Sequence, residues 1–125
     1  MLHFTIQELN PHNYPLTPEI EASLNDLIAK VSLIREAYGL PMTVSSGLRS
    51  QADQQRINPS APKSAHLVGM AVDIADADGK LKEWLKANLH ILEQVDLYCE
   101  SFDSTPSWTH FQTRKTKSGN RVFIP

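Results

Sequence analysis

Residues 64–75 read SAHLVGMAVDIA, and the fold that we expect depends on this stretch. Its second half, residues 70–75, is short and apolar, which predicts a buried strand. Asp73 places a carboxylate inside that strand, and a buried carboxylate requires a cation or several hydrogen-bond donors. His66 lies in the loop that enters the strand, and Gly69 allows the backbone to bend so that the two side chains converge.

Before this stretch, residues 18–38 predict a long helix. Thr17 is a good N-cap and Pro18 suits the first helical position, where a missing N–H costs nothing. Apolar residues then recur at spacings of three and four and form one face. Gly39 then favours the end of the helix at its C-terminus. This helix is expected to be scaffold.

The rest of the chain alternates short elements with turns. We expect a strand at 42–45, a short helix at 51–57, a loop at 58–63, a helix at 80–92, strands at 95–100 and 108–113, and a last short strand at 121–124. This order predicts a single α+β domain over residues 1–125, with a small, mainly antiparallel sheet and flanking helices.

The composition excludes several classes of protein. Among 125 residues, 12 Lys and Arg stand against 14 Asp and Glu, a net charge of -2, which argues against a nucleic-acid partner. A single cysteine, Cys99, excludes an intramolecular disulfide and any site that needs two thiolates. Residues 1–10 have no features of a targeting signal, and charges interrupt the apolar residues 24–40, so we expect synthesis in the cytoplasm and no membrane partner.

A metal in this chain would therefore depend on histidine and carboxylate. Of the five histidines, His110 lies in a predicted strand, and with His66 and Asp73 it completes a set of the kind that catalytic zinc uses. Taken singly, each histidine is more often a hydrogen-bonded structural residue. Asp73 could equally form a structural ion pair with Arg49. These alternatives stay open on spacing alone.

Several motifs occur in an order that points to one family. They are SSGLRS at 45–50, Ser64-x-His66-x6-Asp73, Trp108-x-His110 and, more weakly, HFT at 3–5 with Glu8-Leu9, and SGNR at 118–121. On these motifs the sequence resembles the zinc D-Ala-D-Ala carboxypeptidase family of peptidoglycan metallopeptidases, in its small phage and bacterial branch. The resemblance extends over nearly the whole chain and implies the hedgehog/D-Ala-D-Ala-peptidase-like fold.

The resemblance also implies roles for particular side chains. His66, Asp73 and His110 would bind zinc. Arg49 would bind the scissile carbonyl and stabilise the developing oxyanion, a task that suits a permanently charged guanidinium. Ser64 would contact the substrate. Trp108 is expected to form a wall of the cleft.

The general base is the position at which the sequence departs from many relatives. These place a glutamate three residues before the last histidine, where this chain has Ser107. In the smaller branch a glutamate ends the preceding strand instead, and Glu100 fits that place, with Asp103 as the substitute. The base would take a proton from the attacking water and deliver it to the leaving amine.

Three functions follow from these expectations. The first is a zinc metallopeptidase that cleaves peptidoglycan stem peptides, as a carboxypeptidase or an endolysin-like endopeptidase. The second is a catalytically weak or inactive zinc-containing cell-wall binding module. The third is a structural domain without metal. An extracellular substrate without a signal peptide indicates a phage or prophage product that acts on the cell wall, and we expect a monomer. Loops 58–63 and 101–107 would set which bond is cut.

Overall fold

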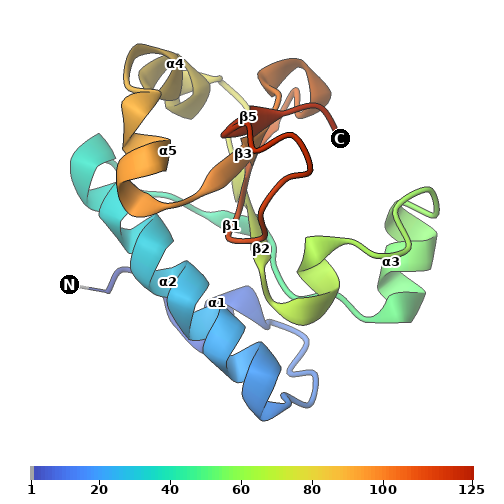
Figure 1. Ribbon diagram of the computed structural model, residues 1–125. Helices are drawn as coiled ribbons and strands as arrows, with labels where there is room; N and C mark the ends of the chain where they lie inside the picture. Colours follow the sequence, from blue (N-terminus) through green and yellow to red (C-terminus); the bar gives the residue numbers. More distant parts are fainter. Residues whose placement is uncertain (1) are drawn as a thin grey trace.

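The long helix α2 (Pro18–Tyr38) forms as the sequence predicts. The Thr17 side chain accepts a hydrogen bond from the amide of Ile20, and Gly39 ends the helix in a left-handed conformation with φ of 79°. Five of its apolar side chains are buried: Leu24, Leu27, Ile28, Val31 and Ile34. The computed structural model describes residues 2–125, and Figure 1 shows α2 running diagonally along one side of the molecule.

The other elements are short. Besides α2, residues 2–125 contain four α-helices, namely α1 (Ile6–Leu9), α3 (Gln51–Ile57), α4 (Lys80–Ala87) and α5 (His90–Val95). They also contain two 3-10 helices, η1 (Ala65–Val68) and η2 (Phe102–Ser104). The strands are β1 (Val44–Ser46), β2 (Ala71–Ala75), β3 (Tyr98–Glu100), β4 (Trp108–Gln112) and β5 (Val122–Phe123). Within residues 2–125, no helix has the length and apolar character needed to cross a bilayer.

The five strands form one sheet in the order β1-β2-β4-β3-β5. Three neighbouring pairs are antiparallel, and β3 and β5 are parallel. The predicted α+β class and mainly antiparallel sheet are therefore confirmed. In the register of β2 and β4, Asp73 lies directly opposite His110.

The two faces of the sheet differ in character: one is apolar and the other is polar. Each strand contributes to both, because successive side chains of a strand point to opposite sides. One face carries Val72, Ile74, Cys99 and Phe111, which are at most 1% exposed and belong to a core shared with α2, α4 and α5. The other face carries the alternate residues Asp73, Glu100, Trp108, His110 and Gln112, which line one pocket. The sheet thus separates the hydrophobic core from the polar side chains.

The predicted helix at 80–92 is wrong in one respect, because it is two helices. Asn88 ends α4: its side-chain amide donates to the carbonyl of Trp84 at 2.8 Å, and its backbone N–H donates to Leu85. This side chain replaces the hydrogen bond that a continuing helix would make. The chain then turns, and α5 buries Ile91 and Leu92.

Other element boundaries differ by a few residues. The strand expected to begin at residue 95 begins at Tyr98, because Val95 ends α5 and Asp96 adopts a left-handed conformation with φ of 60°. Helix α1 was not expected, although the sequence carries its signal, a capping box between Thr5 and Glu8. The 3-10 helix η1 was expected to be loop.

A buried ion pair fixes the start of β4. Asp76 is 4% exposed and accepts hydrogen bonds from the backbone N–H groups of Leu81 and Lys82, both at 3.0 Å. The Lys82 ammonium lies 3.5 Å from Asp76 and also contacts the carbonyl of Trp108. Helix α4 is thereby anchored to the strand that carries His110.

Candidate metal centre

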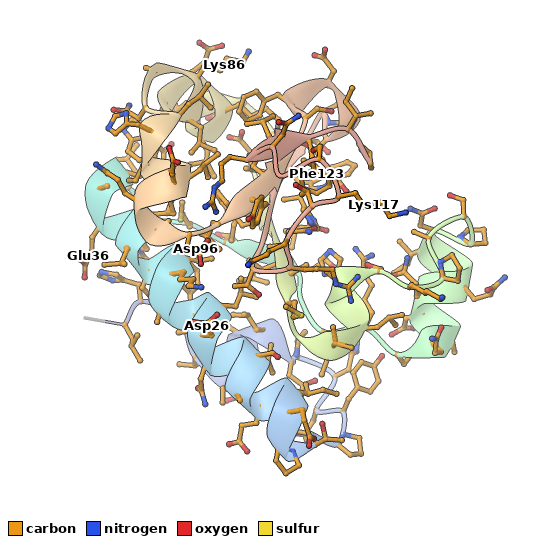
Figure 2. All side chains as sticks on the ribbon, in the orientation of Figure 1. Asp26, Glu36, Lys86, Asp96, Lys117 and Phe123 are labelled. Atoms are coloured by element: carbon orange, nitrogen blue, oxygen red, sulfur yellow. The ribbon has the colours of Figure 1, made fainter. Side chains whose placement is uncertain are left out.

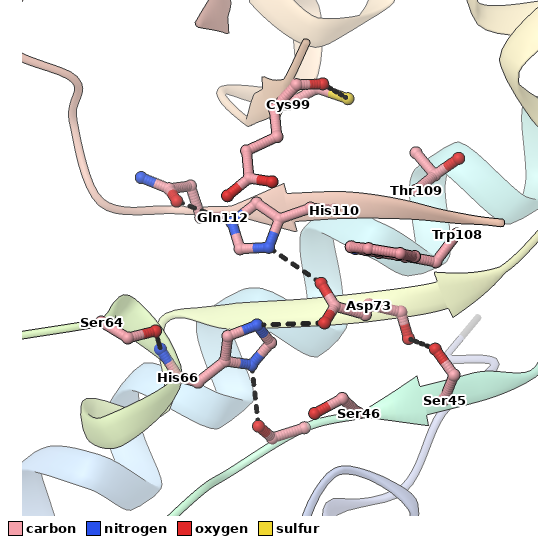
Figure 3. A network of polar contacts seen from close by, with 12 residues as sticks. Ser45, Ser46, Ser64, His66, Asp73, Cys99, Trp108, Thr109, His110 and Gln112 are labelled. Atoms are coloured by element: carbon pink, nitrogen blue, oxygen red, sulfur yellow. Dashed lines mark hydrogen bonds and ion pairs between the residues drawn. The ribbon is translucent and has the colours of Figure 1, made fainter. Parts of the chain in front are cut away.

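The three side chains predicted to bind metal lie together. His66 Nε2 is 3.3 Å from Asp73 Oδ2, and His110 Nδ1 is 2.9 Å from Asp73 Oδ1 (Figure 3). One ligand atom from each residue lies within 4.8 Å of the others. All three residues are buried, with exposed fractions of 3 to 6%.

Each of the three reaches this point from a different element. Asp73 occupies the middle of β2 and His110 lies opposite it on β4, where facing side chains are close neighbours. His66 comes from η1, whose N-cap is the Ser64 hydroxyl, an acceptor for the His66 backbone N–H. Gly69 turns the chain from η1 into β2 with φ of 74°, as its position between His66 and Asp73 led us to expect.

The hydrogen bonds around His66 show which of its atoms is free. Its Nδ1 lies 2.8 Å from the backbone carbonyl oxygen of Gly47, which can only accept, so Nδ1 carries the proton. Nε2 is therefore the nitrogen that faces the Asp73 carboxylate. Two acceptors that face each other at 3.3 Å repel unless a cation or a proton lies between them.

This donor set fits a metal ion. Two imidazole nitrogens and a carboxylate oxygen converge in a buried position, and this is a ligand set of catalytic zinc sites. The carbonyl of Gly47 and the side chain of Gln112, 2.7 Å from His110 Nε2, supply the outer hydrogen bonds that metal-ligating histidines ordinarily make.

The electrostatics of the group favour a charged carboxylate. Burial acts to raise the pKa of Asp73, but hydrogen bonds and positive charge from His110 and His66 outweigh burial and bring that pKa well below its ordinary value. For His110, burial acts to lower the pKa, while the hydrogen bond and charge of Asp73, assisted by the charge of Glu100, raise it. Asp73 thus remains an anion that attracts cationic partners.

Arg49 lies against the same carboxylate. Its Nη2 donates to Asp73 Oδ2 at 3.1 Å, so the ion pair that the sequence offered as an alternative is present beside the histidine contacts. Nε donates to Ser46 and Nη1 donates to the side chain of Gln54, which is 1% exposed. Arg49 is held rigidly at the edge of the candidate metal centre. No pattern in the sequence indicates Gln54 as its partner.

One pocket of about 800 Å³ contains most of the predicted site residues. Besides the three candidate ligands it is lined by Arg49, Ser64, Glu100 and Trp108. Asp103 and Ser107 are exposed and do not line it. The geometry therefore favours Glu100 over Asp103 as the candidate base. Cys99, the neighbour of Glu100, is buried on the core face, and Figure 3 shows its sulfur directed away from His110.

Basic side chains surround the pocket opening. Lys63, Arg114 and Lys117 line it in addition to Arg49, and Arg114 Nη1 donates to the carbonyl of Lys63 at 2.7 Å. Figure 2 shows Lys117 and Phe123 on the C-terminal segment that borders the pocket. These four basic side chains outnumber the two acidic ones in the same lining, Asp73 and Glu100, so the pocket is more positive than a chain of net charge -2 would suggest.

Comparison with known proteins gives one family and one related structure. A family model described as Peptidase M15 matches residues 2–112. The crystal structure of an L-Ala D-Glu endopeptidase from Serratia marcescens, ChiX, has a similar fold, with a TM-score of 0.54 and 22% sequence identity. The match covers 90% of this chain and 99% of that one. No curated protein sequence gives a match.

Proposed function

The chain belongs to the peptidase M15 family, and on that premise we propose that it is a zinc-dependent peptidase that hydrolyses peptide bonds in peptidoglycan stem peptides. The observation that carries the proposal is the convergence of His66, Asp73 and His110 in the pocket that Glu100 lines. The fold shared with an L-Ala D-Glu endopeptidase supports the same assignment.

We assign His66 Nε2, Asp73 and His110 Nδ1 as the ligands of zinc. When bound, zinc supplies a Lewis acid that polarises a carbonyl and lowers the pKa of a water molecule to about 7. The chain's contribution is to hold the three ligand atoms together before the metal arrives. Their outer hydrogen bonds limit rotation of both imidazole rings.

Glu100 is the proposed general base. It ends β3 on the face of the sheet that carries His110, and its charge acts on that histidine. A carboxylate oxygen of Glu100 would accept the proton of the attacking water and then return it to the leaving amine. The position of Glu100 supports an active enzyme. The alternative, an inactive binding module, arises from Ser107, which stands where many relatives have a glutamate.

Arg49, Ser64 and Trp108 are the proposed substrate-binding residues. Three of the five N–H groups of the Arg49 guanidinium donate to described residues, which leaves two for a substrate oxygen. Ser64 accepts the cap hydrogen bond of η1, and its hydroxyl proton remains able to donate to a peptide carbonyl. Trp108 supplies an apolar wall.

We propose an endopeptidase rather than a carboxypeptidase, on the fold shared with an L-Ala D-Glu endopeptidase and on the space beside the metal pocket. A second groove of about 640 Å³ begins at the metal pocket and shares Arg49, Lys63, Ser64 and Arg114 with it. This groove continues past Tyr14 and has a mainly apolar lining. A substrate can therefore extend beyond the reacting bond. Stem peptides carry free carboxylates, which match the basic side chains at the junction of the two hollows.

The test is digestion of a synthetic stem peptide by the zinc-loaded protein, with products identified by mass spectrometry. We expect cleavage at an internal bond and a loss of at least about 100-fold in Glu100→Gln, at unchanged zinc content. Asp103→Asn is the matched control, and it should retain activity. Full activity of Glu100→Gln would exclude Glu100 as the base, and an intact peptide would support the binding module. Action on the cell wall, the monomeric state and a phage or prophage origin stay predictions.

A further inference from the structure

The outer hydrogen bond from His110 to Gln112 bears on which nitrogen of His110 is available to a metal. Gln112 follows His110 by two residues on β4, so both side chains lie on the same face of the sheet. It is a polar side chain only 7% exposed, and its Oε1 lies 2.7 Å from His110 Nε2. Figure 3 shows it on the side of the imidazole ring away from Asp73.

A second hydrogen bond fixes the orientation of the Gln112 amide. Its Nε2 lies 2.9 Å from the backbone carbonyl oxygen of Arg114, which can only accept. The NH2 group must therefore face Arg114, and the amide oxygen must face His110. This removes the usual ambiguity between the two ends of a glutamine side chain.

The orientation of Gln112 in turn determines the proton on His110. Because an amide oxygen only accepts, His110 Nε2 must be the donor and carry the proton. Nδ1 is then the nitrogen left for a metal ion: it lies 2.9 Å from Asp73 Oδ1, and a proton that it donates to this carboxylate is the one that a metal would displace. The carbonyl of Gly47 acts in the same way on His66, but there the nitrogen left for a metal ion is Nε2.

We propose that Gln112 is a positioning residue that selects the tautomer and the ring orientation of His110, so that Nδ1 is the atom that binds zinc. The proposal rests on the proposed function only in naming zinc as the metal. The two histidines would then bind through different nitrogens, each set by its outer hydrogen bond. The anchor of His66 is backbone, whereas the anchor of His110 is a side chain that substitution can remove.

Two substitutions separate the hydrogen bond from the packing. Gln112→Met keeps a similar length but has no acceptor for His110, and Gln112→Glu keeps the acceptor while losing the donor to Arg114. We expect the Kd for zinc, measured by competition with a chelator, to rise about 10- to 100-fold in Gln112→Met. Gln112→Glu should bind zinc at least about tenfold more tightly than Gln112→Met.

NMR of the 15N-labelled histidine rings tests the tautomer without any measurement of activity. In the zinc-loaded wild-type protein we expect the proton of His110 on Nε2 and the metal on Nδ1. This readout depends on which nitrogen of His110 binds the metal and not on peptide cleavage. A proton on Nδ1 and the metal on Nε2 of His110 in the zinc-loaded protein, or wild-type zinc affinity in a folded Gln112→Met protein, would overturn the proposal. Failure of stem-peptide cleavage alone would count against the proposed function and leave the tautomer result intact.

Discussion

Gly47→Ala is the substitution whose effect can be worked out most completely from the structure. A Cβ at position 47 would lie 2.2 Å from the backbone oxygen of Leu9, and real Cβ contacts are not shorter than 3.0 Å. The neighbour is backbone, so rotation of a side chain cannot relieve the clash. The close approach of α1 therefore explains the glycine of the SSGLRS motif at 45–50.

Either way of relieving the clash breaks a hydrogen bond. Movement of Gly47 stretches the 2.8 Å contact between its oxygen and His66 Nδ1, and movement of Leu9 stretches the 2.7 Å bond that Leu48 donates to it. The lost hydrogen bond costs about 1 kcal/mol and the overpacking about 1–3 kcal/mol. We expect Gly47→Ala to lower the free energy of unfolding by about 2–4 kcal/mol.

Urea unfolding of the metal-free protein measures this loss, and chelator competition measures the expected rise of about 10-fold or more in the Kd for zinc. Gly119→Ala is the matched control, because φ at Gly119 is 78° but no atom lies within 4 Å of an added Cβ. It should cost about 1 kcal/mol through its backbone conformation alone and leave zinc affinity unchanged. A loss below about 0.5 kcal/mol in Gly47→Ala would refute the steric reasoning.

Three further predictions concern the thiol, the buried ion pair and the metal. Burial raises the pKa of Cys99 to about 12, so a thiol reagent at pH 8 should label the unfolded chain but not the native protein, and rapid native labelling would contradict the buried position. Asp76→Ala removes the partner of buried Lys82 and should cost about 3–5 kcal/mol in urea unfolding, and a change below about 1 kcal/mol would show that the pair is dispensable. Zinc at 100 times its Kd should stabilise the wild-type protein by about 2.7 kcal/mol in thermal unfolding, and His110→Ala should lose this effect, whereas equal stabilisation of both would place the metal elsewhere.

Much of the fold follows from local signals in the sequence. The helix over residues 18–38 has its cap, its apolar face and its stop within one continuous segment, and the structure reproduces these bounds. The break at Asn88 was missed because the apolar pattern continues through it, while the side-chain hydrogen bond that ends α4 depends on the local conformation. The parallel pairing of β3 with β5 joins strands that are distant in the sequence, so no local pattern indicates it.

For the candidate site, the sequence indicated the three candidate ligands but not the groups that orient them. The motifs and their alternation along β2 and β4 indicated His66, Asp73 and His110, which the structure brings together. The groups that orient them were not predictable. The oxygen of Gly47 is backbone and leaves no trace in residue type, and Gln112 is recognisable only when its hydrogen bonds to His110 and Arg114 are known.

The central claim is that these three side chains hold one zinc ion in the pocket that Glu100 lines. Anomalous diffraction from a crystal of the zinc-loaded protein, recorded on both sides of the zinc absorption edge, tests it most directly. We predict a single peak bonded to His66 Nε2, an Asp73 oxygen and His110 Nδ1, at about 2.0–2.2 Å from each. A peak at any other residues, or no peak in the pocket, would contradict the account.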